Sequence, residues 1–91
     1  MRVKIFAMLR QLVGAKEIEV GLEGDDAVGS VLARLVADYP VLGERIFDDD
    51  GHLQPIINVF VNGRSINFLD GLDTSLNESD VMAIFPPVAG G

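Results

Sequence analysis

The chain has 91 residues, enough for one small domain and too few for two. Apolar residues make up 48% and cysteine is absent, so a hydrophobic core is possible while disulfides, thiolate chemistry and cysteine metal sites are excluded. The formal net charge of −7 argues against nucleic acid or an anionic membrane as partner, and favours a basic protein surface.

The N-terminal segment "RVKIFAML" alternates its side chains with the period of a β-strand. Val3, Ile5, Ala7 and Leu9 would share one face, with Phe6 and Met8 on the other. A short polar connection and a second alternating run, "EIEVGL", with Ile18, Val20 and Leu22 inward, complete a predicted hairpin. Because no apolar run is long enough for a signal peptide or a membrane span, we expect a cytoplasmic protein.

A helical period follows. Apolar residues recur three and four positions apart along one face of a predicted helix: Val28, Val31, Leu32, Leu35, Val36 and Tyr39. Asp25 and Asp26 are expected to cap its start. Pro40 is expected to end it, since proline cannot continue the hydrogen-bond ladder.

The remaining segments predict three further strands. Residues 41–55 indicate an irregular connection with a turn at "DDDG". Asn62-Gly63 lies between two alternating runs, as expected for a tight hairpin turn, and "VMAIF" forms the last strand. The order predicts an α+β fold with a mixed sheet of about five strands and one main helix across one face. The first and last strands should be neighbours at the sheet centre.

No internal group forms a convincing active site. His52 is the only histidine, and a lone histidine in a turn is typical of a solvated surface. The "DDDG" stretch fails as a calcium loop, because the required first and twelfth positions would be Ile46 and Ile57. Four acids before the last strand are interpreted as a solvated loop edge: Asp70, Asp73, Glu78 and Asp80. We therefore expect neither a metal site nor an enzyme.

Large apolar residues are expected on the sheet face opposite the core. They are Phe6, Met8, Phe60, Ala83 and Phe85. A half-exposed sheet normally carries polar residues there, so these side chains indicate a surface that binds a partner. The alternatives are that residues 40–55 cover them, or that the face is wrongly assigned.

The C-terminal "FPPVAGG" carries the remaining chemistry, the α-carboxylate of Gly91. Adenylation would activate it for attack by a sulfur donor, giving a thiocarboxylate, or by a lysine amine, giving an isopeptide. Gly90 and Gly91 lack a Cβ and fit a narrow channel, and six extended residues from Pro86 reach about 20 Å. The predicted division is a domain over 1–85 and a tail over 86–91. The tail's partner-binding residues are Pro86, Pro87, Val88 and Ala89.

The opening "FAMLRQLVG", the strand order and the ending "FPPVAGG" together resemble the MoaD/ThiS group of ubiquitin-like sulfur carriers, which have the β-grasp fold. The resemblance implies that an E1-like enzyme of the MoeB/ThiF type adenylates Gly91 with ATP and Mg²⁺, and that a sulfur donor then forms the thiocarboxylate. It implies that the large subunit of molybdopterin synthase accepts the tail, with this chain as the non-catalytic small subunit. Phe6 and Phe85 match family contact positions.

The middle of the chain leaves the acceptor open. Residues 44–76 are more similar to carriers that serve other pathways, including cysteine synthesis, and to archaeal small modifiers. The alternatives are therefore a sulfur carrier for cysteine, tRNA thiolation or thiamin, or a modifier that forms isopeptides with lysines. Only Lys4 and Lys16 could accept such a bond on the chain itself. A third alternative is a plain binding module with an inert tail.

Overall fold

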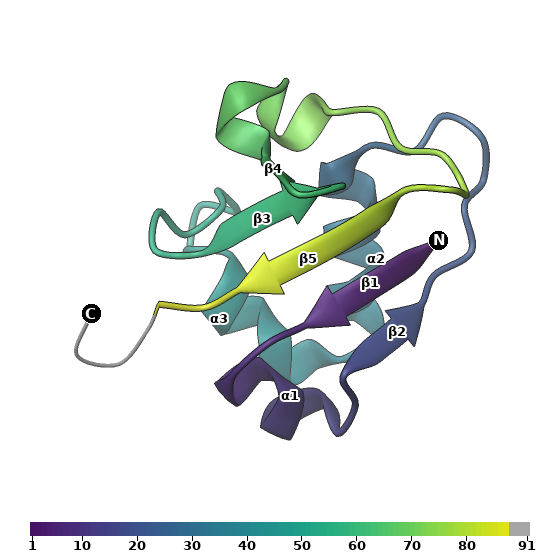
Figure 1. Cartoon of the computed structure of the whole chain (residues 1–91). Helices are drawn as coiled ribbons and strands as arrows, with labels where there is room; N and C mark the ends of the chain where they lie inside the picture. Colours follow the sequence, from purple (N-terminus) through teal and green to yellow (C-terminus); the bar gives the residue numbers. More distant parts are fainter. Residues whose placement is uncertain (88–91) are drawn as a thin grey trace.

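The computed structural model describes residues 1–87, which form a five-stranded mixed sheet with helices on one face (Figure 1). The strand order is β2-β1-β5-β3-β4. This confirms the predicted α+β class. The strands are β1 (Arg2–Ile5), β2 (Glu17–Glu19), β3 (Asn58–Val61), β4 (Arg64–Ser65) and β5 (Val81–Phe85). The helices are α1 (Met8–Val13), α2 (Val28–Asp38) and α3 (Gly43–Ile46), with short 3₁₀ turns η1 (Pro40–Leu42), η2 (Ile66–Phe68) and η3 (Gly71–Asp73).

The first and last strands pair in parallel at the centre of the sheet, as predicted. Val3 lies beside Met82 and Ile5 beside Ile84 in this register. β2 pairs antiparallel with β1, while β3 pairs antiparallel with β5 and with β4. The first and the last strand of the chain are thereby tied to each other in the middle of the sheet.

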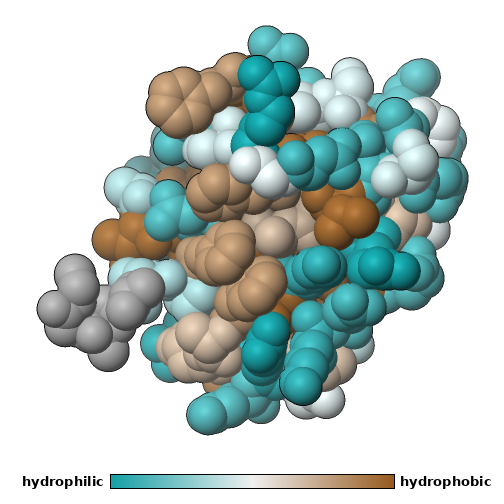
Figure 2. All heavy atoms as spheres, viewed as in Figure 1, coloured by the Kyte–Doolittle hydropathy of each residue, from teal (hydrophilic) through white to brown (hydrophobic). Residues whose placement is uncertain are grey.

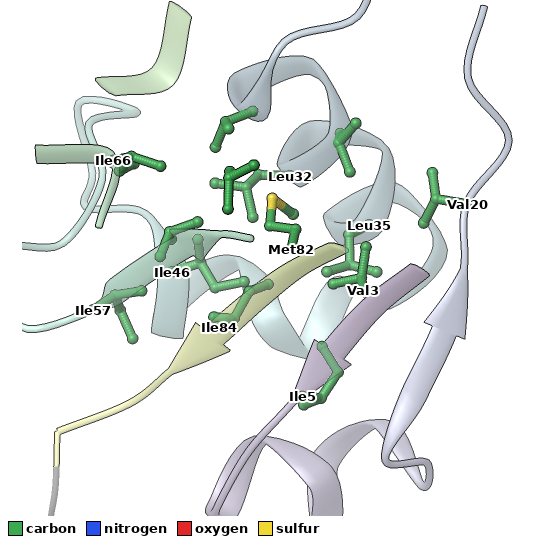
Figure 3. Packing of buried hydrophobic residues seen from close by; sticks show 14 of the residues in the cluster. Val3, Ile5, Val20, Leu32, Leu35, Ile46, Ile57, Ile66, Met82 and Ile84 are labelled. Carbon is green, nitrogen blue, oxygen red and sulfur yellow. The ribbon is translucent and has the colours of Figure 1, made fainter. Parts of the chain in front are cut away.

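The hydrophobic core lies between the sheet and α2 (Figure 3). From the sheet it takes every second residue, namely Val3, Ile5, Val59, Val61, Met82 and Ile84, all buried. From α2 it takes Val28, Val31, Leu32 and Leu35, also buried, while Val36 and Tyr39 pack at its margin. The helical face read from the sequence is confirmed. Pro40 follows the end of α2 and opens η1, as expected.

The predicted strand over residues 2–9 is wrong beyond Ile5. Ala7 has a φ of 53°, which breaks the strand, and α1 begins at Met8. Leu9 is buried from this helix, and Gly14 ends it in the left-handed conformation, its N–H bonded to the Arg10 carbonyl. Ala7 and Leu9 alternate with Phe6 and Met8 as residues of a strand would. A helix of six residues is too short to show a clear period of about 3.6 residues in the sequence.

The connection after α2 is less irregular than predicted. It contains η1 and α3, which bury Leu42 and Ile46 in the core. An isolated bridge between Phe47 and Leu53 then closes the expected turn at Asp48–Gly51. The burial of two residues four positions apart explains the short helix, since this spacing places both on one helical face.

The hairpin between β3 and β4 is confirmed. Asn62 and Gly63 have φ values of 51° and 82°, the positive angles that a tight type I′ turn requires. None of the helices in residues 1–87 combines the length and apolar composition needed to cross a bilayer.

The start of α2 differs from the predicted aspartate cap. Ala27 is the N-cap residue, and its N–H donates to the Ser30 hydroxyl at 2.9 Å. Asp26 is buried and forms an ion pair with Arg34, while it also accepts the Glu23 N–H at 2.6 Å. These donors, Arg34 first, lower the pKa of Asp26 to about 2. Asp26 therefore connects the loop at Glu23 with the second turn of α2, where Arg34 lies.

Replacement of Leu32 by alanine should lower the free energy of unfolding by about 2–5 kcal/mol, the range for leucines deleted from a packed core. Urea denaturation followed by circular dichroism measures this loss. Val41→Ala is the control, because Val41 is half exposed and its truncation should change stability by about 0.5 kcal/mol or less.

The Asp26–Arg34 ion pair predicts a specific pH dependence of stability. Since folding lowers the pKa of Asp26 from 3.8 to about 2, its contribution is present above pH 3.8 and is lost as the pH falls toward about 2. In Asp26→Asn, urea denaturation at a series of pH values should show less loss of stability over this interval than in the wild type. Asp25→Asn, at an exposed neighbour, should keep the wild-type profile; equal profiles for all three proteins would contradict the assignment.

Candidate functional site

Apolar side chains gather on the sheet face that the helices leave open (Figure 2), and three aromatic rings contact one another there. Phe6 and Phe85 stack with their ring centroids 4.3 Å apart and an interplanar angle of 11°. Phe60 meets Phe85 edge to face at 5.4 Å and 78°. We call these three residues the aromatic cluster. Each is half-buried by its neighbours, so the rings form a joined apolar surface without entering the core.

Strand pairing explains why these residues meet. Phe6 directly follows β1, Phe85 ends β5, and the parallel register sets the ends of these two strands side by side. Two residues before Phe85 on β5, Ala83 pairs with Phe60 of β3. The small side chain of Ala83 leaves the surface between the rings open. Because side chains alternate along a strand, the same register that buries Ile5 and Ile84 turns the aromatic cluster outward.

The aromatic cluster is not covered by residues 40–55. No residue of this segment lines the groove beside the cluster, which is lined by Phe6, Ala7, Asn58, Phe60, Gly63, Phe85, Pro86 and Pro87. Within the segment, η1 contacts α1 and α2 on the helical side of the sheet. The predicted placement of Phe6, Phe60, Ala83 and Phe85 on the open face is therefore confirmed, and the covering alternative is wrong. Their role in partner binding stays a prediction.

Met8 is the exception among the predicted face residues. It lies in α1, 36% exposed, and lines a second groove with Ile56, Pro86 and Pro87. The cause is the positive φ of Ala7, which ends the strand before Met8 could join the sheet face. The helical spacing of Leu9, Leu12 and Val13 is the sequence signal that could have revealed α1 and this groove.

The base of the tail lies between the two apolar surfaces. Pro86 is buried and Pro87 exposed, and both line the groove of Met8 as well as the groove beside the aromatic cluster. Pro87, the last residue that the structure describes, therefore lies next to both surfaces. The predicted site residues Val88, Ala89, Gly90 and Gly91 lie outside the described residues. The predicted boundary between domain and tail after Phe85 stays a prediction.

The turn at Asp48–Gly51 brings together Asp48, Asp50 and His52, all exposed. The Asp48 carboxylate accepts the N–H groups of Asp50 and His52, each at 2.9 Å, so it serves to close the turn. The placement of His52 in an exposed turn is as predicted.

One of the loop acids has a structural role that the sequence did not indicate. Glu78 accepts the N-terminal ammonium of Met1 at 2.9 Å and the Leu22 N–H at 3.2 Å. These bonds, the ammonium first, lower the pKa of Glu78, and the bond to Glu78 in turn raises the pKa of the ammonium. Glu78 thereby holds the start of β1 to the loop before β5.

A mixed sheet wrapped on one main helix, with an apolar open face beside the end of its last strand, defines the ubiquitin-like β-grasp class of small carrier and modifier proteins. The chain belongs to the ThiS family, whose model matches residues 3–91. Both the predicted family and the predicted fold are confirmed.

Two curated relatives show what this class contains. The chain is 42% identical to small archaeal modifier protein 3 of Haloferax volcanii, over 100% of this chain and 98% of the relative. It is 35% identical to the sulfur carrier protein CysO of Mycobacterium tuberculosis, over 98% of this chain and 96% of the relative. These relatives are carriers and modifiers rather than enzymes, in agreement with the prediction.

Solved structures agree with the fold over nearly the full length. The crystal structure of SAMP1 from Haloferax volcanii superposes with a TM-score of 0.90 at 39% identity, covering 99% of this chain and 97% of that one. CysO in the crystal structure of the Amycolatopsis orientalis BexX/CysO complex gives 0.83 at 28% identity, with coverage of 99% and 98%. That relative therefore binds a partner protein.

The stacked pair Phe6–Phe85 predicts an energetic coupling that a double-mutant cycle can measure. Phe6→Ala and Phe85→Ala together should cost less stability than the sum of the single changes, by about 0.5–1.5 kcal/mol. The control cycle joins Phe6 to Phe68, which is 84% exposed on η2, and should be additive. Additivity in both cycles would show that the stack contributes nothing to the fold.

Proposed function

We propose that this chain is a sulfur carrier whose reacting group is the carboxylate of Gly91. The observation that supports this most is positional. The chain belongs to the ThiS family. At the end of β5, Pro86 and Pro87, which form the base of the "FPPVAGG" tail, lie at the edge of the aromatic cluster. A partner that grips the cluster would therefore also hold the start of the tail.

The proposed chemistry has two steps. A carboxylate oxygen of Gly91 attacks the α-phosphorus of ATP, bound with Mg²⁺ by an E1-like activating enzyme, and pyrophosphate leaves. A sulfur donor at the oxidation level of hydrosulfide then attacks the acyl carbon through its sulfur and AMP leaves; loss of the proton from this sulfur gives the thiocarboxylate with no change of oxidation state. The adenylate is needed because a free carboxylate is a poor electrophile.

The folded body supplies orientation instead of reacting groups. Four extended residues beyond Pro87 span at most about 14 Å, so the enzyme that holds the aromatic cluster must place its reactive centre within this distance. Contacts made away from the reaction can position the terminus, which lowers the entropic part of the barrier. Gly90 and Gly91 leave the carbonyl unhindered in a narrow channel.

For the acceptor of the sulfur we propose the large subunit of molybdopterin synthase, in the cytoplasm. The ending "FPPVAGG" supports this choice, because it is the part of the chain most similar to MoaD-type carriers. The sulfur would then build the dithiolene of molybdopterin. Acceptors in cysteine, tRNA or thiamin metabolism are the alternatives, and the identity of 35% with CysO over 98% of this chain favours the first of them.

A second candidate function is protein modification. It is favoured by the identity of 42% with small archaeal modifier protein 3 over the full length of both chains. The same Gly91 adenylate would then be attacked by a lysine amine, with AMP as the leaving group and an isopeptide as the product. Gly91 joined to lysines in protein digests would distinguish this function from sulfur transfer.

Incubation with the activating enzyme, ATP, Mg²⁺ and a sulfur donor should replace one oxygen of the chain by sulfur at Gly91. Intact mass spectrometry with terminal fragmentation measures the change. A variant lacking Gly91 should stay unmodified while its urea denaturation matches that of the wild type, because the last residue of the core among residues 1–87 is Ile84. An unmodified wild type in the presence of an enzyme shown to be active would overturn the proposal.

A further inference from the structure

Positive charge is concentrated in the first segment of this acidic chain. Residues 1–16 contain four of the seven basic side chains and none of the fourteen acidic ones. The rest of the chain is strongly acidic. This asymmetry creates one region able to attract an anionic partner on a protein that otherwise repels anions.

Three of the four basic residues surround one surface pocket. Lys4, Arg10 and Lys16 line it together with Phe6 and Glu17. We call this the basic pocket. Through Phe6 it adjoins the aromatic cluster, so one partner could contact both. Figure 2 shows the apolar cluster bordered by hydrophilic side chains on the side of β1 and β2.

The backbone and neighbouring groups hold these basic residues in place. Arg10 donates from Nε to the Ile5 carbonyl at 2.6 Å, and its guanidinium lies over the Phe6 ring at 4.9 Å from the centroid. The Lys16 carbonyl accepts the Ile5 N–H at 2.8 Å, which ties this residue to β1. Lys4 belongs to β1 and pairs with Ala83. The basic pocket is therefore built on β1, which pairs with the central strand β5.

The charges of the basic pocket are not neutralised inside the described part of the chain. Lys4, Arg10 and Lys16 form no ion pair with a carboxylate of residues 1–87. Glu17, the one acid at the pocket, has its carboxylate 3.5 Å from Arg2 Nε. The pocket thus presents net positive charge to any surface that approaches the aromatic cluster.

We propose that the basic pocket binds carboxylates of an acidic segment on the partner protein that docks on the aromatic cluster. This inference rests on the proposed function, since that partner is the activating enzyme. An aspartate or glutamate beside an apolar patch would complement both features at once. Charge pairs at the rim of an interface set the association rate and the choice of partner more than the total affinity.

Nucleic acid fits this surface less well than protein. Binding to a phosphate backbone needs a row of basic side chains, whereas this pocket has three basic residues on a chain of net charge −7. Single-stranded recognition also uses free aromatic faces. Phe6 is already stacked on Phe85 and covered by the Arg10 guanidinium. A compact pair of carboxylates is the better match.

The test compares two doubly substituted chains of equal charge. Lys4→Gln with Lys16→Gln empties the basic pocket of lysine, while Asn67→Asp with Ser75→Asp makes the same charge change between β4 and β5. Calorimetric titration with the activating enzyme at low and high salt should show weaker binding by the lysine variant, about two- to thirtyfold at low salt. Its binding should also depend less on salt, and the control should match the wild type. Equal binding by all three chains would overturn the proposal.

A second measurement does not depend on the enzyme. Hexaglutamate added to the ¹⁵N-labelled chain should shift the amide resonances around Lys4, Arg10 and Lys16 in the wild type, but not in the lysine variant. Shifts spread over the whole surface, or tighter binding of a single-stranded oligonucleotide at the basic pocket, would overturn the proposal. If Gly91 does not acquire sulfur, the proposed function is contradicted. The hexaglutamate titration still tests the basic pocket in that case, because it does not use the enzyme.

Discussion

The parallel pairing of β1 with β5 is the interaction on which the rest of the structure depends. It joins the first strand of the chain to the last, in a register that sets Ile5 beside Ile84. The inner face of this pair carries the centre of the core against α2, and the outer face ends in the stacked rings of Phe6 and Phe85. Stability and the candidate site therefore arise from the same hydrogen bonds.

This arrangement separates the stable part of the molecule from the part proposed to react. The core and the ion pairs of Asp26 and Glu78 fix the body, and neither ion pair includes a residue of the aromatic cluster. The cluster and the basic pocket then offer a partner one apolar and one cationic surface, both attached to β1. Because Pro86 and Pro87 lie at the edge of the cluster, a docked partner is automatically close to the base of the tail.

Features that depend on short-range patterns could be predicted from the sequence. The face of α2, the hairpin turn at Asn62-Gly63 and the strand Val81–Phe85 each follow from a period or a turn rule within one segment. Met8 was misplaced because a six-residue helix shows little more than one turn of its own pattern. The ion pair of Asp26 with Arg34 was missed because the two residues are eight positions apart, whereas the recognised pairs on a helix surface are three or four positions apart.

The sequence by itself determined the chemistry that is available. The chain contains no cysteine, so thiol chemistry is excluded, and its net charge of −7 favours a protein partner over nucleic acid. The Gly91 carboxylate is the group that we propose to react. Only the tertiary structure decided where the recognition surface lies. Phe60 and Phe85 lie on β3 and β5, whereas Phe6 directly follows β1. Lys16, directly before β2, lies near Lys4 because β2 pairs with β1. Such meetings depend on strand order and register, which arise from packing the whole core and are not encoded in the period of any one segment.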